Sequence, residues 1–450
     1  LLPGYPRDVS PEGAASPIHG FDTACDPSVR AGANGLFFLS GIAFDRSGGA
    51  GAVFVSRFID NNNLEKVRRD EYLRPIKDPI GYVDTRIVAT GNPGLFLDMP
   101  SLAVDVPRTA TLTEMVDGQL VPAANVYLAY TVFPGLIDKN ARSMVYLARS
   151  TNCGRTWGAP IKVSESQQLI QRAVVAVAPN DPTGNTVYLA FRRFRFETLP
   201  DAIVVVKSVD GGKKFSKPAV VAALPYPFDQ AMDENRFRTN TYPTMAVDEN
   251  GVVSVAWAER RTRDGLPSAA GQARIVVASS PDGFTWTDPA PVDLADESGL
   301  LDGHQAMPSL TYAGGKLMLA WYDQRGTLAK TADASGCVTE FIEDEPGAYR
   351  QTLDVRAAEG RPGWPPVFFP SRQVSRYLFH LVLGSNGEPL LDEDGYYALV
   401  QAEDNPVNFP LFQLGTRPFI GDYIDLAPSP QFLPPPLTGG SLWKPNLDGF

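Results

Sequence analysis

Arginine and carboxylate side chains recur just after short apolar strands, at a fixed distance from an aromatic residue. The three segments are Phe191-Arg-Arg193-Phe-Arg195, Trp257-Ala-Glu259-Arg-Arg261 and Trp321-Tyr-Asp323-Gln-Arg325. Clustered guanidinium groups can bind a carboxylate through paired hydrogen bonds. They can also form ion pairs between neighbouring strands. Repetition favours the ion pairs, because a catalytic residue usually occurs once.

A second set of charged residues lies at or near the starts of other apolar strands. Its members are Asp98, Arg172, Arg236, Arg238, His304 and Asp422. If the starts of those strands converge on one channel, these side chains are the first candidates for ligand binding or catalysis.

Metal and cofactor patterns are missing from the sequence. The three histidines, His19, His304 and His380, lack metal-ligand spacing, and no nucleophile elbow or phosphate-binding glycine loop occurs. We therefore expect no catalytic metal and no cofactor. Two acidic segments, Asp392-Glu-Asp394 and Glu343-Asp-Glu345, could hold a structural calcium ion or could be solvated surface charge.

A three-part unit repeats along the chain and would position these residues. Its opening strand is clearest in Asp98-Met-Pro-Ser-Leu-Ala-Val-Asp105, Tyr242-Pro-Thr-Met-Ala-Val-Asp248 and Met307-Pro-Ser-Leu-Thr-Tyr312; looser copies are Asp26-Pro-Ser-Val29 and Phe419-Ile-Gly-Asp-Tyr-Ile-Asp-Leu426. The second strand ends in an aromatic, as in Val187-Tyr-Leu-Ala-Phe191. Many short apolar strands with frequent turns predict an all-β fold.

The third part of the unit is an apolar strand that runs into a Ser/Asp/Gly turn closed by an aromatic. The copies are Ser150-Thr-Asn152-Cys-Gly154-Arg-Thr-Trp157, Ser208-Val-Asp210-Gly-Gly212-Lys-Lys-Phe215 and Ser280-Pro-Asp282-Gly283-Phe-Thr-Trp286, with a degraded copy at Ser56-Arg-Phe-Ile-Asp60. A short Asp or Asn side chain can accept backbone N–H bonds within such a loop, and glycine supplies a positive φ. We interpret these residues as structural staples between strands.

The Ser-x-Asp-x-Gly-x-x-Trp pattern resembles the Asp-box, or bacterial neuraminidase repeat, of the sialidase superfamily. The best match runs from Ser208 to Phe215, and the recurring strands extend the resemblance from about Asp26 to Asp425. The resemblance implies a six-bladed β-propeller of four-stranded antiparallel blades. The blades would start near residues 26, 98, 172, 242, 307 and 419, with residues 1–25 as an extension or closing strap. The last blade would be incomplete or closed by the N-terminal segment.

The resemblance also implies roles for single residues. By position, Tyr423 would be the nucleophile, Glu259 its base and Asp98 the acid; a clamp for the substrate carboxylate would include Arg172, Arg238 and Arg325. A neutral phenol as nucleophile would avoid repulsion with an anionic sugar. The family's first arginine usually lies in an Arg-Ile-Pro motif, and this sequence has none. That departure leaves the clamp incomplete and argues against sialidase activity.

Composition limits the partners. The net charge is -11 and 44% of the residues are hydrophobic, which favours a folded core and disfavours nucleic acid as a partner. Apolar runs are too short to span a bilayer. The chain has three cysteines, so one disulfide and one free thiol are possible. The chain begins with Leu1 rather than Met. We expect a secreted or extracytoplasmic protein, as a mature form or an excised domain.

Three functional hypotheses remain. The first is an extracellular binding or scaffold module for a glycan or a partner protein. The second is a glycoside hydrolase that acts at the channel mouth. The third is a structural subunit of a cell-surface assembly, which would use the insertion at residues 326–350 as a contact surface.

Overall fold

The structure is a computed structural model and is nearly all β. It describes residues 2–5, 8–47, 50–60, 80–107, 112–135, 142–165, 168–230, 238–293, 303–325, 330–332, 338–341, 353–375, 379–391, 398–401, 424–427, 432–433 and 444–445. The one helix among them is α1 (Pro11–Ala15), where the Ser10 hydroxyl accepts the Gly13 N–H at 2.9 Å. In the described residues no helix is long and apolar enough to cross a membrane.

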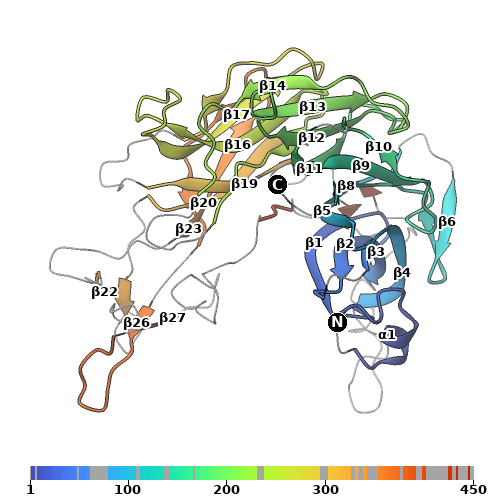
Figure 1. Cartoon of the computed structure of the whole chain (residues 1–450), viewed down its shortest axis with the longest axis horizontal. Coiled ribbons are helices and arrows are strands. Elements are labelled where there is room, and N and C mark those ends of the chain that lie inside the picture. Colours follow the sequence, from blue (N-terminus) through green and yellow to red (C-terminus); the bar gives the residue numbers. More distant parts are fainter. Residues whose placement is uncertain are drawn as a thin grey trace.

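The described residues form five successive sheets with antiparallel neighbours, each built mainly from consecutive strands (Figure 1). The first contains β1 (Thr23–Ala31), β2 (Leu36–Phe44), β3 (Gly51–Asp60) and β4 (Ile80–Gly91). The second contains β5 (Leu95–Asp105), β8 (Asn125–Pro134), β9 (Met144–Ser150) and β10 (Ile161–Lys162), and the third β11 (Ile170–Val177), β12 (Val187–Arg193), β13 (Ala202–Ser208) and β14 (Ala219–Ala223).

The fourth sheet contains β15 (Thr244–Val247), β16 (Val253–Arg261), β17 (Gln272–Ser280) and β18 (Ala290–Pro291). The fifth contains β19 (Gln305–Ala313), β20 (Lys316–Asp323) and β23 (Asp354–Arg361), with β24 (Val367–Phe368) and β25 (Arg372–Gln373) both paired to β23. The predicted sixth blade, from residue 419, lies mostly outside the described residues, which include residues 424–426 of its predicted opening strand and residues 432–433 and 444–445.

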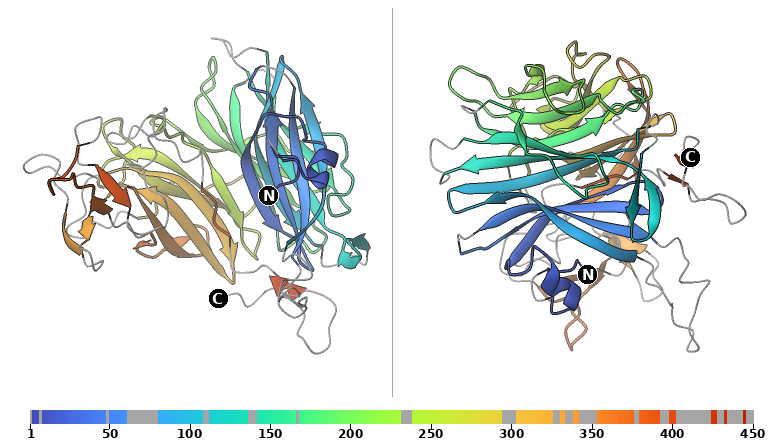
Figure 2. Two further views of the ribbon diagram at one scale, coloured as in Figure 1. Left: turned by 90° about the horizontal axis from the view of Figure 1, so that it is seen from below. Right: turned by 90° about the vertical axis from the view of Figure 1, so that its right-hand side faces the viewer.

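Smaller elements are attached to these sheets. A hairpin of β6 (Thr113–Val116) and β7 (Gln119–Pro122) is inserted in the second sheet. A separate sheet contains β21 (Lys330–Ala332), β22 (Val338–Phe341), β26 (Phe379–Leu381) and β27 (Leu399–Gln401), and β28 (Phe432–Leu433) pairs with β29 (Lys444–Pro445). Helix α1 lies beside the first sheet (Figure 2), where Ile18 packs with Ala43 and Phe54.

The sheets pack face to face, because their central strands are apolar on both faces. In β13, Val204 and Val206 pack toward the second sheet. Ile203 and Val205, which point the other way, pack toward the fourth. Successive side chains of a strand point to opposite faces, and both faces of β13 are buried, so every position in the run is apolar. Each buried aliphatic side chain contributes about 1.5–3 kcal/mol to stability. Sheets stacked face to face, with their first strands around a common cavity, are the arrangement of blades in a β-propeller.

The Ser/Asp/Gly turns are held by bonds within a few residues. The Ser208 hydroxyl accepts the Gly212 N–H at 2.9 Å and donates to Asp210 Oδ1 at 2.8 Å. Asp210 Oδ1 also accepts the N–H groups of Lys213 and Lys214, each at 3.0 Å. The closing aromatics Trp157, Phe215 and Trp286 pack on the cores between sheets. The degraded copy at residues 56–60 differs, because it lies within strand β3.

Each of these turns also contacts the preceding sheet. A cross-strand pair of an aromatic and a cation meets the turn's glycine: Phe38 and Arg57 at Gly154, Tyr127 and Arg149 at Gly211 and Gly212, and Tyr188 and Lys207 at Gly283. The cations bind directly as well. Arg57 Nη1 donates to the Cys153 carbonyl at 3.2 Å, and Lys207 Nζ donates to the Asp282 carbonyl at 3.1 Å.

The fourth sheet has no such pair. Ser254 and Ser279 occupy the corresponding cross-strand positions, and the fifth sheet lacks a Ser/Asp/Gly turn in its sequence. The pair and the turn therefore occur together, which identifies them as two halves of one joint between neighbouring sheets.

Candidate functional site

A central cavity of about 320 Å³ lies between the first strands of the five sheets. Strands β1, β5, β11, β15 and β19 each contribute wall residues, and residues 424–427 complete the lining. The polar groups in the wall are Ser28, Arg30, Ser101, Arg172, Asn240, Tyr242, Thr244, Ser309, Thr311, Tyr312 and Asp425. Because five sheets supply these groups, the cavity exists only when the sheets are assembled.

Four of these first strands share a backbone irregularity at the same end of the cavity. Asp26, Met99, Arg172 and Met307 have φ values of 56°, 51°, 55° and 51°, and each lies inside a register shift between the first and second strands. A β-bulge with a left-handed residue redirects the neighbouring side chains. Such backbone costs about 1–3 kcal/mol for a residue other than glycine and clusters at functional sites. We call this end the mouth of the cavity.

Two carboxylates meet beside the wall residues Pro27 and Pro100, although neither carboxylate lines the cavity itself. Asp98 Oδ1 accepts the Met99 N–H at 2.9 Å, and Asp26 Oδ2 accepts the same N–H at 3.3 Å. Both aspartates also act on the neighbouring thiol: partial desolvation and then the charges of Asp26 and Asp98 raise the pKa of Cys25 to about 12. The Cys25 thiol therefore stays neutral at neutral pH.

The next first strands add a cation and a phenol. Arg172 lines the cavity from β11, one blade from Asp98. The side chains of Tyr242 and Gln171 hydrogen-bond at 2.6 Å, which ties the third sheet to the fourth beside the cavity. The mouth thus combines paired acceptors, a guanidinium and a phenol, which can hydrogen-bond to a ligand rich in hydroxyl groups.

Elsewhere in the cavity wall, Arg30 of the first sheet binds the C-terminal wall segment. Its Nη1 lies 2.5 Å from Asp425 Oδ2 and its Nη2 lies 3.5 Å from Asp425 Oδ1. The Arg30 side chain is 32% exposed and the Asp425 side chain is 47% exposed, so this ion pair faces solvent. It joins β1 to residues 424–427, which are separated from it by nearly the whole chain.

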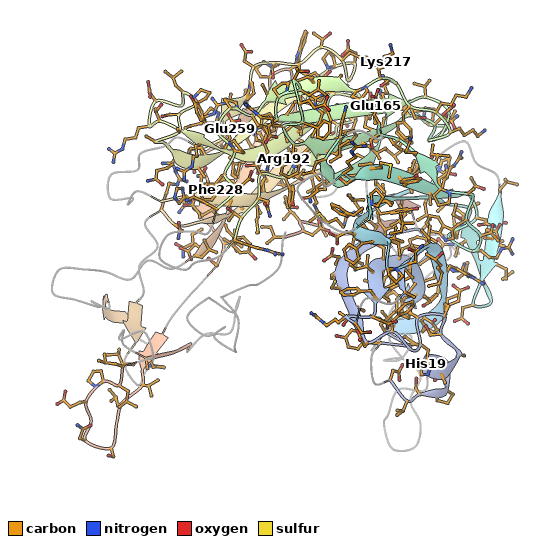
Figure 3. The ribbon with its side chains drawn as sticks, in the orientation of Figure 1. His19, Glu165, Arg192, Lys217, Phe228 and Glu259 are labelled. Atoms are coloured by element: carbon orange, nitrogen blue, oxygen red, sulfur yellow. The ribbon has the colours of Figure 1, made fainter. Side chains whose placement is uncertain are left out.

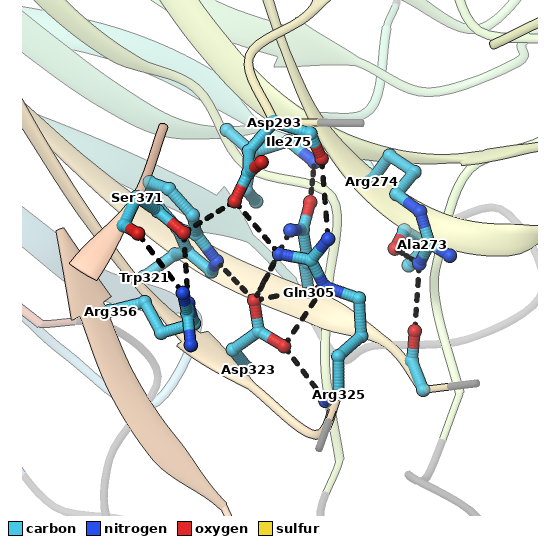
Figure 4. A network of polar contacts seen from close by, with 11 residues as sticks. Ala273, Arg274, Ile275, Asp293, Gln305, Trp321, Asp323, Arg325, Arg356 and Ser371 are labelled. Atoms are coloured by element: carbon cyan, nitrogen blue, oxygen red, sulfur yellow. Dashed lines mark hydrogen bonds and ion pairs between the residues drawn. The ribbon is translucent and has the colours of Figure 1, made fainter. Parts of the chain in front are cut away.

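Two predicted site residues lie in buried networks between strands rather than in the cavity wall. Glu259 is 3% exposed and accepts the Trp257 indole N–H at 2.9 Å and the Arg261 Nε–H at 2.7 Å; it lies in the fourth sheet (Figure 3). Arg325 donates to Asp323 at 2.8 Å and to Asp293 at 3.0 Å (Figure 4). These carboxylates raise the pKa of Arg325 although burial opposes them.

The other predicted residues are spread over the molecule. Asp98 and Arg172 belong to the mouth. Arg238 is exposed and lies two residues before Asn240, a wall residue. Tyr423 lies outside the described residues. The structure adds Asp26, which sequence reasoning placed only in an opening strand; its signal was the match of Asp26-Pro-Ser-Val to Met307-Pro-Ser-Leu.

Cysteine and metal chemistry is limited in the described part of the chain. Cys25 and Cys153 are both free thiols, and Cys337 lies outside the described residues. No group of three His, Cys, Asp or Glu side chains among the described residues could hold a metal ion. Both acidic segments suggested for calcium, at residues 343–345 and 392–394, fall outside that part.

Comparison with known proteins finds similarity only to solved structures. No family model matches the sequence, and no curated protein matches it. A point mutant of NanB sialidase from Streptococcus pneumoniae is 9% identical, with 81% of this chain and 64% of that chain covered and a TM-score of 0.43. A point mutant of an α-L-arabinofuranosidase from Fusarium graminearum is 12% identical, with 81% and 84% covered and a TM-score of 0.39. An α-L-arabinanase from Penicillium chrysogenum is 14% identical, with 64% and 77% covered and a TM-score of 0.36. At these scores the likenesses assign neither a substrate nor a residue.

Proposed function

We propose that this chain is an extracellular, six-bladed sialidase-like propeller that binds a glycan at the mouth of its central cavity. The observation that carries the proposal is the row of equivalent left-handed residues at the starts of four first strands. Left-handed backbone at residues other than glycine clusters at functional sites. The backbone feature repeats, but the side chains beside it differ from sheet to sheet and include Asp26, Asp98 and Arg172.

The fold part of the proposal draws on two further features. The Ser/Asp/Gly turns have the bonding expected of Asp-boxes, with serine and aspartate oxygens closing the loop. Residues 424–427 lie in the cavity wall, where the first strand of a sixth blade would stand. The turns support the Asp-box repeat, and the position of residues 424–427 supports a sixth blade.

The ligand part rests on the chemistry of the mouth. The Asp26 and Asp98 carboxylates can accept hydrogen bonds from sugar hydroxyls, while Arg172 donates in a fixed planar geometry. A few convergent polar groups in a concave site are typical of small-ligand recognition. The protein's net charge of -11 would not prevent binding, since neutral sugars carry no charge to repel.

A glycan-array screen followed by calorimetry tests this proposal. Arg172→Ala should lower the affinity for the bound glycan about tenfold or more, because a charged hydrogen bond contributes about 1.5–3 kcal/mol. Arg155→Ala is the matched control, since Arg155 is an exposed arginine whose partner is Glu114, away from the cavity. Equal affinities of the two variants, or no glycan binding by the wild type, would refute the proposal.

A second candidate function is glycoside hydrolysis, favoured by the two carboxylates that share the Met99 N–H. One carboxyl group would protonate the leaving oxygen, and the other carboxylate would attack the sugar or activate a water. Fluorogenic glycosides, including a sialoside, test this function. Turnover lost in Asp26→Asn and Asp98→Asn would support it, and sialoside turnover lost in Tyr423→Phe would assign the nucleophile to Tyr423. Glycan binding without turnover would reject hydrolysis and support the proposed binding function.

A further inference from the structure

A second pocket opens beside the mouth, between the turn of the β2–β3 hairpin and the turn that joins β4 to β5. We call it the hairpin pocket; its walls are residues 43–46, 50–52, 92–93 and 95–97, and its volume is about 240 Å³. The first sheet supplies one wall through β2 and β3, and the second supplies the other through the start of β5. None of the functions considered above uses this pocket.

The hairpin pocket combines an exposed aromatic with oriented polar groups. Phe96 keeps 38% of its exposure although its ring packs edge-on against Phe44 at 5.8 Å between centroids. Asn92 Oδ1 accepts the Gly94 N–H at 2.9 Å, which orients its amide at the rim. Arg46 is held by its Nε–H bond to the Thr23 hydroxyl at 3.1 Å.

These features match the two sides of a sugar ring. The apolar C–H face of a pyranose can lie on an aromatic ring, while its hydroxyl edge bonds to an amide, a carboxylate or a guanidinium. An exposed phenylalanine on a protein surface costs free energy, and a ligand that covers it offsets that cost. Asp45 adds the carboxylate to this wall.

Strand β5 connects this pocket to the central cavity. Residues 95–97 line the hairpin pocket, Asp98 follows at the mouth, and residues 100–104 line the cavity. Phe96 and Asp98 are two residues apart, so they are separated by roughly 6–7 Å along the strand. A sugar unit bound between Asp98 and Arg172 therefore leaves the Phe96 ring for a neighbouring unit of the chain.

We propose that the hairpin pocket is a second sugar subsite, and that the ligand is an oligosaccharide chain that runs from the mouth along β5 to Phe96. This inference rests on the proposed glycan binding at the mouth. A chain whose terminal unit lies at Asp98 and Arg172 would place a later unit on the Phe96 ring. The protein would then distinguish chains from single sugars.

The test measures affinity against chain length. Calorimetry would use cello-, xylo- and chito-oligosaccharides and oligogalacturonides of one to six units, each with the wild type and with Phe96→Leu. Leucine keeps the apolar contact with Phe44 but removes the aromatic face. In the wild type the affinity should rise about tenfold between one unit and the longer chains. Phe96→Leu should remove this rise and leave the affinity for a single unit unchanged.

A matched control and a second variant keep the result interpretable. Phe369→Leu changes a phenylalanine of nearly the same exposure, 37%, beside the fifth sheet and should behave as the wild type. Asn92→Ala should lower the affinity for chains but not for single sugars. A length gain that survives both Phe96→Leu and Asn92→Ala, or single-sugar binding without any gain, would overturn the subsite while leaving the mouth intact. Absence of all binding would refute the proposed function as well.

Discussion

At the scale of single residues, the three Ser/Asp/Gly turns perform one task with two kinds of side chain. Asp282 Oδ1 accepts the N–H groups of Phe284 and Thr285, each at 2.7 Å. In the first turn Asn152 Oδ1 accepts the Thr156 N–H at 3.0 Å. The amide and the carboxylate therefore give similar geometry, but only the carboxylate titrates.

The difference predicts a pH dependence in the two turns that hold an aspartate, because backbone hydrogen bonds lower the pKa of both Asp210 and Asp282. The backbone bonds lower the pKa of Asp282 to about 2 from a usual 3.8. Because the folded pKa is the lower one, the stabilisation is present above pH 4 and is lost as the pH falls toward 2. Because Asp282 is partly exposed to solvent, its carboxylate contributes only about 1 kcal/mol to the free energy of unfolding. Thermal melts of wild type and Asp282→Asn should therefore converge between pH 4 and pH 2.

The chain contains its own reciprocal control for this prediction. Asn152→Asp introduces a carboxylate into an equivalent turn, so it should add a pH dependence of the same sign. A difference in melting temperature between wild type and Asp282→Asn that stayed constant from pH 6 to pH 2 would contradict the assignment.

At the scale of elements, the joint between a turn and the preceding sheet depends on glycine. Gly212 has a φ of 79°, and a Cβ there would lie 2.9 Å from Leu147 Cδ2 and 3.3 Å from the Tyr127 ring. The same turn holds Gly211 against Arg149. The glycines are therefore required by backbone angle and by the close approach of the neighbouring sheet.

Gly212→Ala should accordingly destabilise the protein by about 3 kcal/mol, from a left-handed alanine plus overpacking at Leu147. Gly118 is the matched control, because it has a φ of 75° at the tip of the β6–β7 hairpin and a Cβ there would meet no atom within 4 Å. Gly118→Ala should cost only about 1 kcal/mol of backbone strain. Urea unfolding of both variants measures the difference; equal losses would mean that packing against Leu147 contributes nothing.

At the scale of the whole molecule, the Arg30–Asp425 ion pair connects the first sheet to residues 424–427 of the cavity wall. Exposed pairs contribute about 0–1 kcal/mol and weaken with salt. The pair should therefore control local opening of residues 424–427 more than global stability. Because the segment lines the cavity, its opening would also alter the binding site.

Arg30→Asp places two carboxylates together, so the amides of Ile424 and Leu426 should exchange hydrogen faster. The amides of β12 and β13 should exchange as in the wild type, since they lie in the buried third sheet. The double variant Arg30→Asp/Asp425→Arg restores opposite charges and should restore slow exchange. Unchanged exchange in Arg30→Asp would show that packing alone holds the segment.

Local features of the fold could be predicted from the sequence, because their causes lie within a few residues. The turn at Ser208 and Asp210 closes through bonds that span at most four residues. The strands around Ile203 and Trp257 are apolar, β-branched or aromatic runs. The repeated Pro-Ser after Asp26, Met99 and Met307 marks first strands wherever they lie.

The candidate site could be predicted only in part, because an alignment on sequence spacing cannot show which way a side chain faces. Arg325 and Arg172 were equally good candidates for binding a carboxylate. The structure surrounds Arg325 with Asp293 and Asp323 and leaves Arg172 in the cavity wall. The sequence did not predict Asp26 as a site residue, because the Met99 N–H that its carboxylate accepts is 73 residues away.

The sequence by itself determined the strand units, their turns and their order, since hydrogen bonds within a turn and a period of two need only neighbouring residues. The tertiary structure alone decided which polar side chains meet at the mouth, which charges are buried as ion pairs and where the hairpin pocket opens. These properties depend on residues from different sheets, and their proximity arises only when the sheets pack around a common cavity.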